Sequence, residues 1–242
     1  MKRKHLRKLS IFIVIFINFS ILCNASPLDS IRTSFQEQNK KSDYISFSFG
    51  MGINYCNNNS LIDFIELQIP NYNTVPQDER FSQFSTGLEF FGGVEYQLVR
   101  NFSIKGDYSY FIKSINIPRF PNYDFSYINH QPYIIFNYII PQEYFYLKIG
   151  GGVGYLLSNL TVKEFSYQQD YSSTGVGLKL EGIFNAQISK NVASYLSGFI
   201  TQSFQSYLKD GNDVILKSRD NRTVNLSSLG FGLRLGLEVF IF

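Results

Sequence analysis

The chain has 242 residues, enough for one or two soluble domains or a single β-barrel. Aromatic residues make up 17% of it and charged residues also 17%, with 24 Phe, 17 Tyr and no Trp. Its formal net charge of +3 is small, and no basic patch favours a nucleic-acid partner.

Residues 1–25 have the organisation of a secretory signal peptide. Five Lys and Arg side chains lie within the first eight residues, an apolar stretch runs from Leu9 to Leu22, and small residues precede Ser26. The apolar stretch is short for a transmembrane helix, which needs about 20 residues. A lipoprotein signal ending at Cys23 is the alternative, and the large Leu22 before it disfavours this. Cleavage would remove five positive charges and no negative ones, which changes the net charge from +3 to −2.

Residues 26–43 are rich in Gln, Lys, Ser and Asn, and we expect them to form a flexible segment before the folded region. The mature chain would keep a single cysteine, Cys56. An internal disulfide is then impossible, and an inert thiol near a strand end is expected.

From residue 44 onward, large apolar residues alternate with small or polar ones, and this period of two indicates β-strands. In the first segment every second residue from Ile45 to Tyr55 is large and apolar. The fourth segment is apolar on both faces, so its facing is undecided, and the seventh has the weakest pattern. The eight predicted segments are 44–55, 84–98, 102–113, 125–140, 145–157, 173–188, 192–205 and 226–242.

The connections between these segments alternate in length. Long connections are expected at 57–83, 114–124, 158–172 and 206–225, and short ones at 99–101, 141–143 and 189–191. This asymmetry is typical of bacterial transmembrane barrels, whose long loops lie outside and whose short turns lie in the periplasm. The sequence therefore predicts an all-β fold, an eight-stranded antiparallel up-and-down transmembrane β-barrel over residues 44–242. Both chain ends, including residues 26–43, would then be periplasmic.

The C-terminal residues resemble the signal by which outer-membrane barrels are recognised for assembly. A polar residue is followed by a glycine, two apolar residues and a final aromatic: Arg234, Gly236, Val239, Ile241 and Phe242. The pattern predicts two kinds of partner, the barrel-assembly machinery and outer-membrane lipids. A soluble ligand-carrying barrel of lipocalin type would explain the alternation, but neither the loop asymmetry nor this ending.

Charged residues of the predicted strands fall on the face of small side chains. Large apolar residues must face lipid, and the interior of an eight-stranded barrel is just wide enough for side chains to fill. We therefore expect four positive and five negative groups inside, paired with one another because isolated buried charges are costly. They would form a salt-bridge plug or, alternatively, a gated proton or ion path. The predicted network is Glu89, Glu95, Lys105, Asp107, Lys148, Lys179, Glu181, Arg234 and Glu238.

One histidine, His130, remains after signal cleavage, and it raises the possibility of a lipid-modifying enzyme. A catalytic histidine needs a nucleophile within hydrogen-bond reach. Ser126 is four residues away, roughly 13 Å at the rise of a strand, and cannot be that partner. No other serine lies in a recognisable motif, so we expect a structural histidine and no catalytic residues.

Metal and cofactor sites are not expected. The sequence has no His pair or Cys cluster with zinc spacing. Asp210 to Asp213 lack the ligand series of a calcium loop, and we expect a polar turn there. Gly150, Gly152 and Gly154 lack the helix and lysine of a phosphate-binding loop. We expect these glycines to relieve crowding or to help the barrel curve.

The long loops are the best candidates for specific contacts, because a barrel fixes their ends and leaves their tips free to vary. The loop 57–83 contains many apolar residues for a solvated segment. It either folds over the mouth as a cap or binds a partner, and we favour the cap. Envelope or extracellular proteins are the partners expected for the loops 57–83 and 206–225.

The fourth and fifth segments resemble an outer-membrane β-barrel domain family that is abundant in Bacteroidota-type bacteria. The resemblance lies in Pro132-Tyr-Ile-Ile-Phe-Asn-Tyr138, in the turn Pro141-Gln-Glu143, and in the glycine-rich strand Phe145 to Tyr155. Tyr133 and Asn137 depart from the usual Leu and Lys. The family outline covers about residues 43–242, and it implies the fold and the outer membrane but no single activity. Some members are secretion-associated, PorT-like barrels.

These observations leave three hypotheses for function. The first is a non-enzymatic barrel with a plugged lumen that anchors or contacts partners through its long loops. The second is a lipid-modifying enzyme that uses His130. The third is a narrow channel or a secretion-associated barrel.

Overall fold

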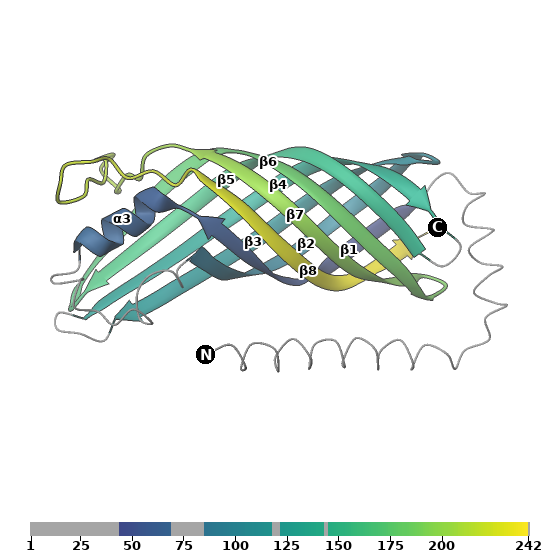
Figure 1. The fold of residues 1–242 in the computed structure, drawn as a ribbon, viewed down its shortest axis with the longest axis horizontal. Coiled ribbons are helices and arrows are strands. Elements are labelled where there is room, and N and C mark those ends of the chain that lie inside the picture. Colours follow the sequence, from purple (N-terminus) through teal and green to yellow (C-terminus); the bar gives the residue numbers. More distant parts are fainter. Residues whose placement is uncertain (1–43, 69–84, 118–121, 143–144, 242) are drawn as a thin grey trace, which may run out of the picture.

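The computed structural model describes residues 44–68, 85–117, 122–142 and 145–241. Eight antiparallel strands in chain order form a closed barrel, and a helix follows the first strand (Figure 1). The elements are β1 (Ile45–Asn57), α3 (Asn59–Gln68), β2 (Thr86–Val99), β3 (Phe102–Ile117), β4 (Tyr123–Pro141), β5 (Phe145–Glu164), β6 (Tyr167–Ser189), β7 (Val192–Gln205) and β8 (Ser228–Ile241). The predicted fold class is confirmed.

Several predictions concern residues outside the described ones. The signal peptide at 1–25, the flexible segment at 26–43 and the terminal Phe242 all belong to this group. Among the helical residues that the structure describes, none forms a helix long and apolar enough to cross a membrane.

The ring closes where β1 pairs with β8. The pairing begins at Ile45↔Ile241 and continues without a shift to Asn57↔Leu229, while the other edge of β1 pairs with β2. Every strand thus has a hydrogen-bonded neighbour on both sides. Closure of this kind is what a strand needs in lipid, where no water can satisfy an open edge.

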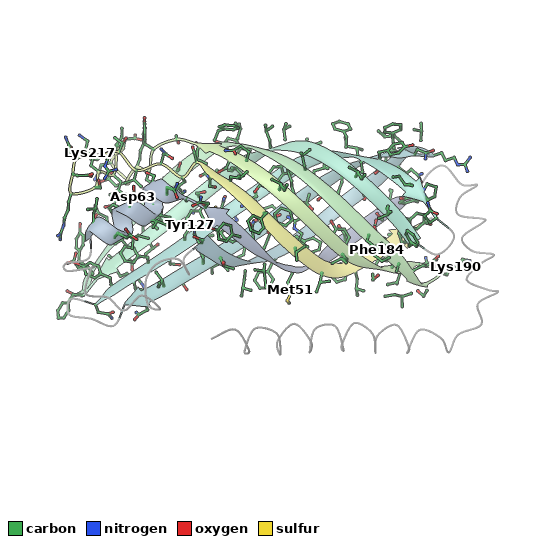
Figure 2. All side chains as sticks on the ribbon, in the orientation of Figure 1. Met51, Asp63, Tyr127, Phe184, Lys190 and Lys217 are labelled. Carbon is green, nitrogen blue, oxygen red and sulfur yellow. The ribbon has the colours of Figure 1, made fainter. Side chains whose placement is uncertain are left out.

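The outer surface carries large apolar side chains at every second position. In β1 they run from Ile45 to Ile53, and Met51 among them is 60% exposed and points away from the barrel (Figure 2). Nine residues of tilted strand match the about 9–11 that cross a bilayer. The exterior of the barrel is therefore a belt suited to lipid.

The interior is closed by buried apolar and aromatic side chains near the end with the short turns, which is the end predicted to be periplasmic. This periplasmic cluster consists of Tyr44, Ile139, Tyr146, Ala193 and Phe240. It lies at the strand ends that adjoin the short turns, and the Tyr44 and Phe240 rings meet edge to face at 5.3 Å.

Two of the predicted long loops are largely strand. Residues 158–172 were expected to form a loop, but β5 continues to Glu164, β6 starts at Tyr167, and only a two-residue turn separates them. In the predicted loop 114–124, β3 continues to Ile117 and β4 starts at Tyr123. The sheet thus extends beyond the apolar belt at the outer end.

Side-chain polarity reverses in this outer extension. In β5, Leu160 and Val162 point inward, while Asn159 and Lys163 point outward. Outside the membrane the exterior of the sheet faces water, so its apolar face must turn inward. β4 shows the same reversal, and its sequence is apolar on both faces also because Tyr133, Ile135 and Ile139 point inward within the belt.

Pro132 interrupts one ladder without a bulge. Its pairing with β3 is continuous at Tyr108↔Pro132, whereas the pairing with β5 stops at His130↔Leu157 and resumes at Tyr133↔Gly154 in the same register. A proline within a strand favours a bulge or a ladder break, and the structure has the break. Proline has no N–H to donate, and this accounts for the gap.

The glycine-rich strand relieves crowding inside the barrel, as predicted. A side chain at Gly154 would collide with the backbone oxygen of Pro132 and with the Tyr133 ring. A side chain at Gly177, across the ladder from Gly154, would collide with the Tyr133 hydroxyl. The two glycines therefore make the space in which the Tyr133 side chain lies.

Candidate functional site

All nine residues predicted to form the lumen network lie inside the barrel. They come from β2, β3, β5, β6 and β8, and none is more than 3% exposed. Their contacts divide them into two groups. The outer group contains Glu89, Lys105, Asp107, Lys179, Glu181 and Arg234, and the periplasmic group contains Glu95, Lys148 and Glu238.

Arg234 is the centre of the outer group. Its Nε donates to Glu89 at 3.0 Å, and its Nη1 donates to both carboxylate oxygens of Asp107, at 3.0 and 3.3 Å. Its Nη2 donates to Glu89 and to the Ser109 hydroxyl. One guanidinium thereby joins β8 to β2 and β3 through charge-assisted hydrogen bonds, the stronger kind.

Two lysines complete the outer group. Lys179 Nζ donates to Asp107 at 2.8 Å, and Lys105 Nζ donates to Glu181 and, at 3.3 Å, to the Tyr195 hydroxyl. Three cations here match three carboxylates, so the group is formally neutral. Such balance is what burial of charges requires.

Aromatic rings enclose the outer group. The guanidinium carbon of Arg234 lies 4.8 Å from the Phe91 ring centre and 4.7 Å from that of Phe199. Lys179 Nζ lies 4.9 Å from the centre of the same Phe199 ring. These cation–π contacts fill the space between the charged groups and the barrel wall.

The periplasmic group is smaller. Lys148 Nζ donates to Glu95 at 2.9 Å and to Glu238 at 2.8 Å. The hydroxyl of Ser103 donates to Glu95, and that of Ser46 donates to Glu238. These contacts tie β5 to β2 and to β8, the strand that closes the ring.

A small polar chamber lies between the outer group and the outer end of the barrel. Its volume is about 20 Å³, which fits a single water. Asn54, Asn129 and Ser203 are among its lining residues, and the Cys56 thiol lines it as well, donating to the Ser228 hydroxyl at 3.1 Å. The chamber is therefore too small to be a solute path.

The outer end is closed by a second packed cluster, which we call the outer cap. It joins α3, the inward faces of β3 to β6, and the segment 206–227, and α3 and this segment lie at the same end of the barrel (Figure 1). Its buried members are Leu61, Phe64, Ile65, Phe111, Tyr123, Phe125, Tyr127, Leu160, Val162, Tyr171, Leu208, Leu216, Val224 and Leu226. The part of the loop 57–83 that the structure describes therefore packs over the mouth, as favoured.

The helix α3 follows from local sequence signals. The Asn58 side chain accepts a hydrogen bond from the Leu61 N–H at 2.9 Å, as an N-cap residue does. Leu61, Phe64 and Ile65 recur at the spacing of one helix face, and this face is buried. The sequence thus contained a helix signal that period-two analysis did not detect.

Segment 206–227 is ordered and consists of three short stretches, which we call passes, that hydrogen-bond to one another. The N–H of Leu208 donates to the Val224 carbonyl, that of Leu216 to Leu208, and that of Val224 to Leu216, at 2.8 to 3.1 Å. These three residues, eight apart in the sequence, all point into the outer cap. The segment therefore repeats one short unit, a regularity visible in the sequence only after the fold is known.

Two similar turns connect the three passes. The N–H of Asp213 donates to the Asp210 carbonyl, and that of Asn221 donates to the Ser218 carbonyl. Asp213 and Asn221 have positive φ angles of 62° and 65°, which Asn and Asp tolerate better than other side chains. The Asp210 carboxylate accepts hydrogen bonds from two backbone N–H groups at 2.9 Å, so Asp210 to Asp213 form the polar turn that the sequence predicts.

His130 lies on the outward face. Its Nδ1 and the Tyr108 hydroxyl are 2.6 Å apart, and its ring centre lies 5.2 Å from that of Tyr110. The facing of His130, which the sequence left undecided, is thus away from the lumen network. Within the described residues its side chain hydrogen-bonds to no serine or carboxylate. The same residues contain no group of three or more His, Cys, Asp or Glu that could hold a metal ion.

The closed ring, the apolar exterior and the charged interior define the class of this protein, an eight-stranded β-barrel of the transmembrane type. No family model and no curated protein matches the sequence. Solved structures do match. The chain is similar to a major outer membrane protein from Thermus thermophilus, at 10% identity and a TM-score of 0.51, over 81% of this chain and 99% of that one.

Two further similarities have lower scores. Ail, the attachment invasion locus protein of Yersinia pestis, crystallised with the heparin analogue sucrose octasulfate, has 10% identity and a TM-score of 0.49, over 83% of this chain and 100% of that one. The outer membrane protease OmpT from Escherichia coli has 11% identity and a TM-score of 0.39, over 82% of this chain and 96% of that one. At such identities the similarity concerns the fold alone, and a fold does not decide between enzyme and non-enzyme.

Proposed function

We propose that this chain is an integral protein of the bacterial outer membrane that acts through its external surface, without enzymatic activity and without an open pore. The observation that carries the proposal is the packing of α3 and segment 206–227 into one cluster with the extended strands. A barrel that served as a pore would gain nothing from a mouth filled with buried aromatic and aliphatic side chains. A rigid outer surface, in contrast, suits recognition.

The expected partners follow from the two ends of the molecule. Outer-membrane lipids would surround the apolar belt, and the barrel-assembly machinery would recognise the C-terminal residues Arg234, Gly236, Val239, Ile241 and Phe242. At the outer end, α3 and segment 206–227 would contact envelope or extracellular proteins. Membership of the Bacteroidota-type family, and of its secretion-associated branch, stays a prediction.

Crosslinking in the native envelope tests the contact surface. A photoreactive amino acid at Lys217, which lies at the outer end of the barrel (Figure 2), should capture a partner. The same group at Lys190, in the turn at the opposite end, serves as the matched control. If Lys217 yields no product that Lys190 lacks, the proposed contact surface is wrong.

A lipid-modifying enzyme is the second candidate, because His130 lies on the face that lipid would contact. We expect the His130→Ala variant to leave the lipid composition of the envelope unchanged, because Tyr108 is the only hydrogen-bonding partner of the His130 side chain among the described residues, and an acyl-transfer site also needs a third group that orients the base. Mass spectrometry of envelope lipids gives the answer. A changed acyl-chain pattern in this variant, but not in Tyr110→Phe, would support the enzyme.

A further inference from the structure

A cleft of about 220 Å³ lies between α3 and the last turn of segment 206–227. Ser60 and Asp63 of α3 line one side, and Ser218 and Arg222 of the segment line the other. Phe64 and Val224, both buried in the outer cap, form its base. The cleft is smaller than the 300–1,000 Å³ typical of drug-sized ligands, and it suits a single ring.

Arg222 is held in position from behind. Its Nε donates to the Asp220 carboxylate, and the Ser218 hydroxyl donates to the same carboxylate. The hydrogen bond from Ser218, followed by those from Arg222, lowers the pKa of Asp220 and keeps this carboxylate charged. With Nε engaged, the Nη groups of Arg222 form the free edge of the guanidinium.

That free edge lies beside Asp63. Arg222 Nη1 is 3.7 Å from Asp63 Oδ2, which is too far for a hydrogen bond, and the two side chains are 67% and 53% exposed. A hydrogen-bond donor edge and an acceptor edge thus stand next to each other at the mouth of the cleft. Each has hydrogen-bonding capacity left for a ligand.

The two sides of the cleft are fixed relative to each other. Phe64 follows Asp63 directly in the chain, and Val224 follows Arg222 by two residues, and both are buried in the outer cap. The N–H of Asn225 also donates to the Ser60 hydroxyl at 3.2 Å, which joins the segment to the helix. Little ordering is then needed when a ligand binds, and such preorganisation favours affinity.

The charges select the chemistry of the ligand. Asp63 and Arg222 are the charged residues among those that line the cleft, and their charges balance, so phosphate and sulfate groups gain no net attraction and meet the Asp63 carboxylate at the mouth. A divalent cation would be repelled by the guanidinium between the carboxylates of Asp63 and Asp220. A sugar fits better, because each hydroxyl both donates and accepts, so neighbouring hydroxyls can accept from Arg222 and donate to Asp63. We propose that this cleft binds one neutral sugar ring through two adjacent hydroxyl groups.

The proposal deepens the external contact function proposed above and rests on it, since it names the chemistry that the outer surface would recognise. The protein, reconstituted in nanodiscs, is titrated with methyl α-mannoside and methyl β-galactoside by saturation-transfer NMR. The matched probe is a tetrahydropyran ring with a single hydroxymethyl group. At least one sugar should bind with a Kd on the order of 1 mM, and the single-hydroxyl ring about tenfold more weakly.

Variants locate the site. Asp63→Asn and Arg222→Gln should each weaken sugar binding about tenfold, because each removes a charged hydrogen bond. Asp213→Asn and Lys217→Gln likewise remove one negative and one positive charge, but at residues of segment 206–227 that do not line the cleft. Both variants should bind the sugar as the wild type does. A heat-dependent gel shift verifies that each variant is folded.

Three results would overturn the proposal. The first is that neither sugar gives saturation transfer at about ten times that Kd. The second is that Asp63→Asn and Arg222→Gln leave sugar binding unchanged. The third is that inorganic sulfate displaces the sugar. None of them affects crosslinking at Lys217, so failure of the sugar site and failure of the proposed function can be told apart.

Discussion

Arg234, on the last strand, contacts charged groups from two other strands. It binds Glu89 and Asp107 from β2 and β3 and lies between the rings of Phe91 and Phe199. Among the described ion pairs, its removal would leave the buried Glu89 without a cation and would take one of three cations from Asp107. The cost of such a loss is set by the partners that remain, more than by the residue removed.

We therefore expect Arg234→Met to lower the free energy of unfolding by about 3–5 kcal/mol. Urea unfolding in lipid vesicles, followed by tyrosine fluorescence, measures this. The matched control is Arg100→Met, because Arg100 lies exposed in the turn between β2 and β3 and should change stability by less than about 0.5 kcal/mol. Equal stability of the two variants would contradict the structural role of the network.

Two glycines offer a second comparison at the residue scale. A methyl group at Gly154 would meet the Pro132 carbonyl and the Tyr133 ring, whereas one at Gly182 would meet nothing within 4 Å. Gly154→Ala should therefore lower the free energy of unfolding by about 1–3 kcal/mol, and Gly182→Ala should leave it unchanged or raise it. The same urea titration distinguishes them, and the reverse order would show that Tyr133 does not lie against Gly154.

Among the elements, the strands could be predicted from sequence where one rule applied along their whole length. β1 follows the lipid rule, with large side chains outward, and β8 follows it except at Phe240, which is buried in the periplasmic cluster. β5 and β6 follow it only within the belt, and the opposite rule applies above it, where Leu160 and Tyr171 point inward. In the sequence this reversal resembles the end of a strand, and for this reason the pattern predicts a loop at 158–172.

The network and the outer cap were predictable to different degrees. The nine charged residues could be identified because the parity of the strands within the belt fixes their facing. Their partners could not, because pairings such as Lys105 with Glu181 depend on how non-adjacent strands meet across the lumen. The outer cap could not be predicted in this way, because it is built from α3 and segment 206–227, and neither has a sequence pattern of period two.

The outer cap can be probed through α3. Phe64 is buried in the cap, whereas Leu67 on the same helix is 37% exposed. Replacing Phe64 with Ala should weaken the cap by about 3–5 kcal/mol and expose Cys56, which packs against it. We expect a membrane-impermeant maleimide to label Cys56 at least about tenfold faster in Phe64→Ala than in the wild type.

Leu67→Ala is the control, and it should label at the wild-type rate. Both variants should keep the heat-dependent gel shift of a closed barrel, because the cap lies outside the belt. If Phe64→Ala and Leu67→Ala label Cys56 equally fast, α3 does not seal the chamber.

At the scale of the whole molecule, side chains of the described residues pack along the lumen from one end to the other. The periplasmic cluster, the two charged groups and the outer cap follow one another along the barrel, and the polar chamber between them holds about one water. Under the proposed function, the external surface is then the part of the molecule that meets a partner.

Single-channel recording in planar bilayers tests the filled lumen most directly. Inserted wild-type protein should give no steady conductance steps at moderate voltage of either sign, because packed side chains of the described residues fill the lumen between the two ends. Insertion is verified by the gel shift of protein recovered from the same vesicles. Long-lived, reproducible open steps from folded wild-type protein would contradict a sealed barrel and favour the narrow channel over the proposed function.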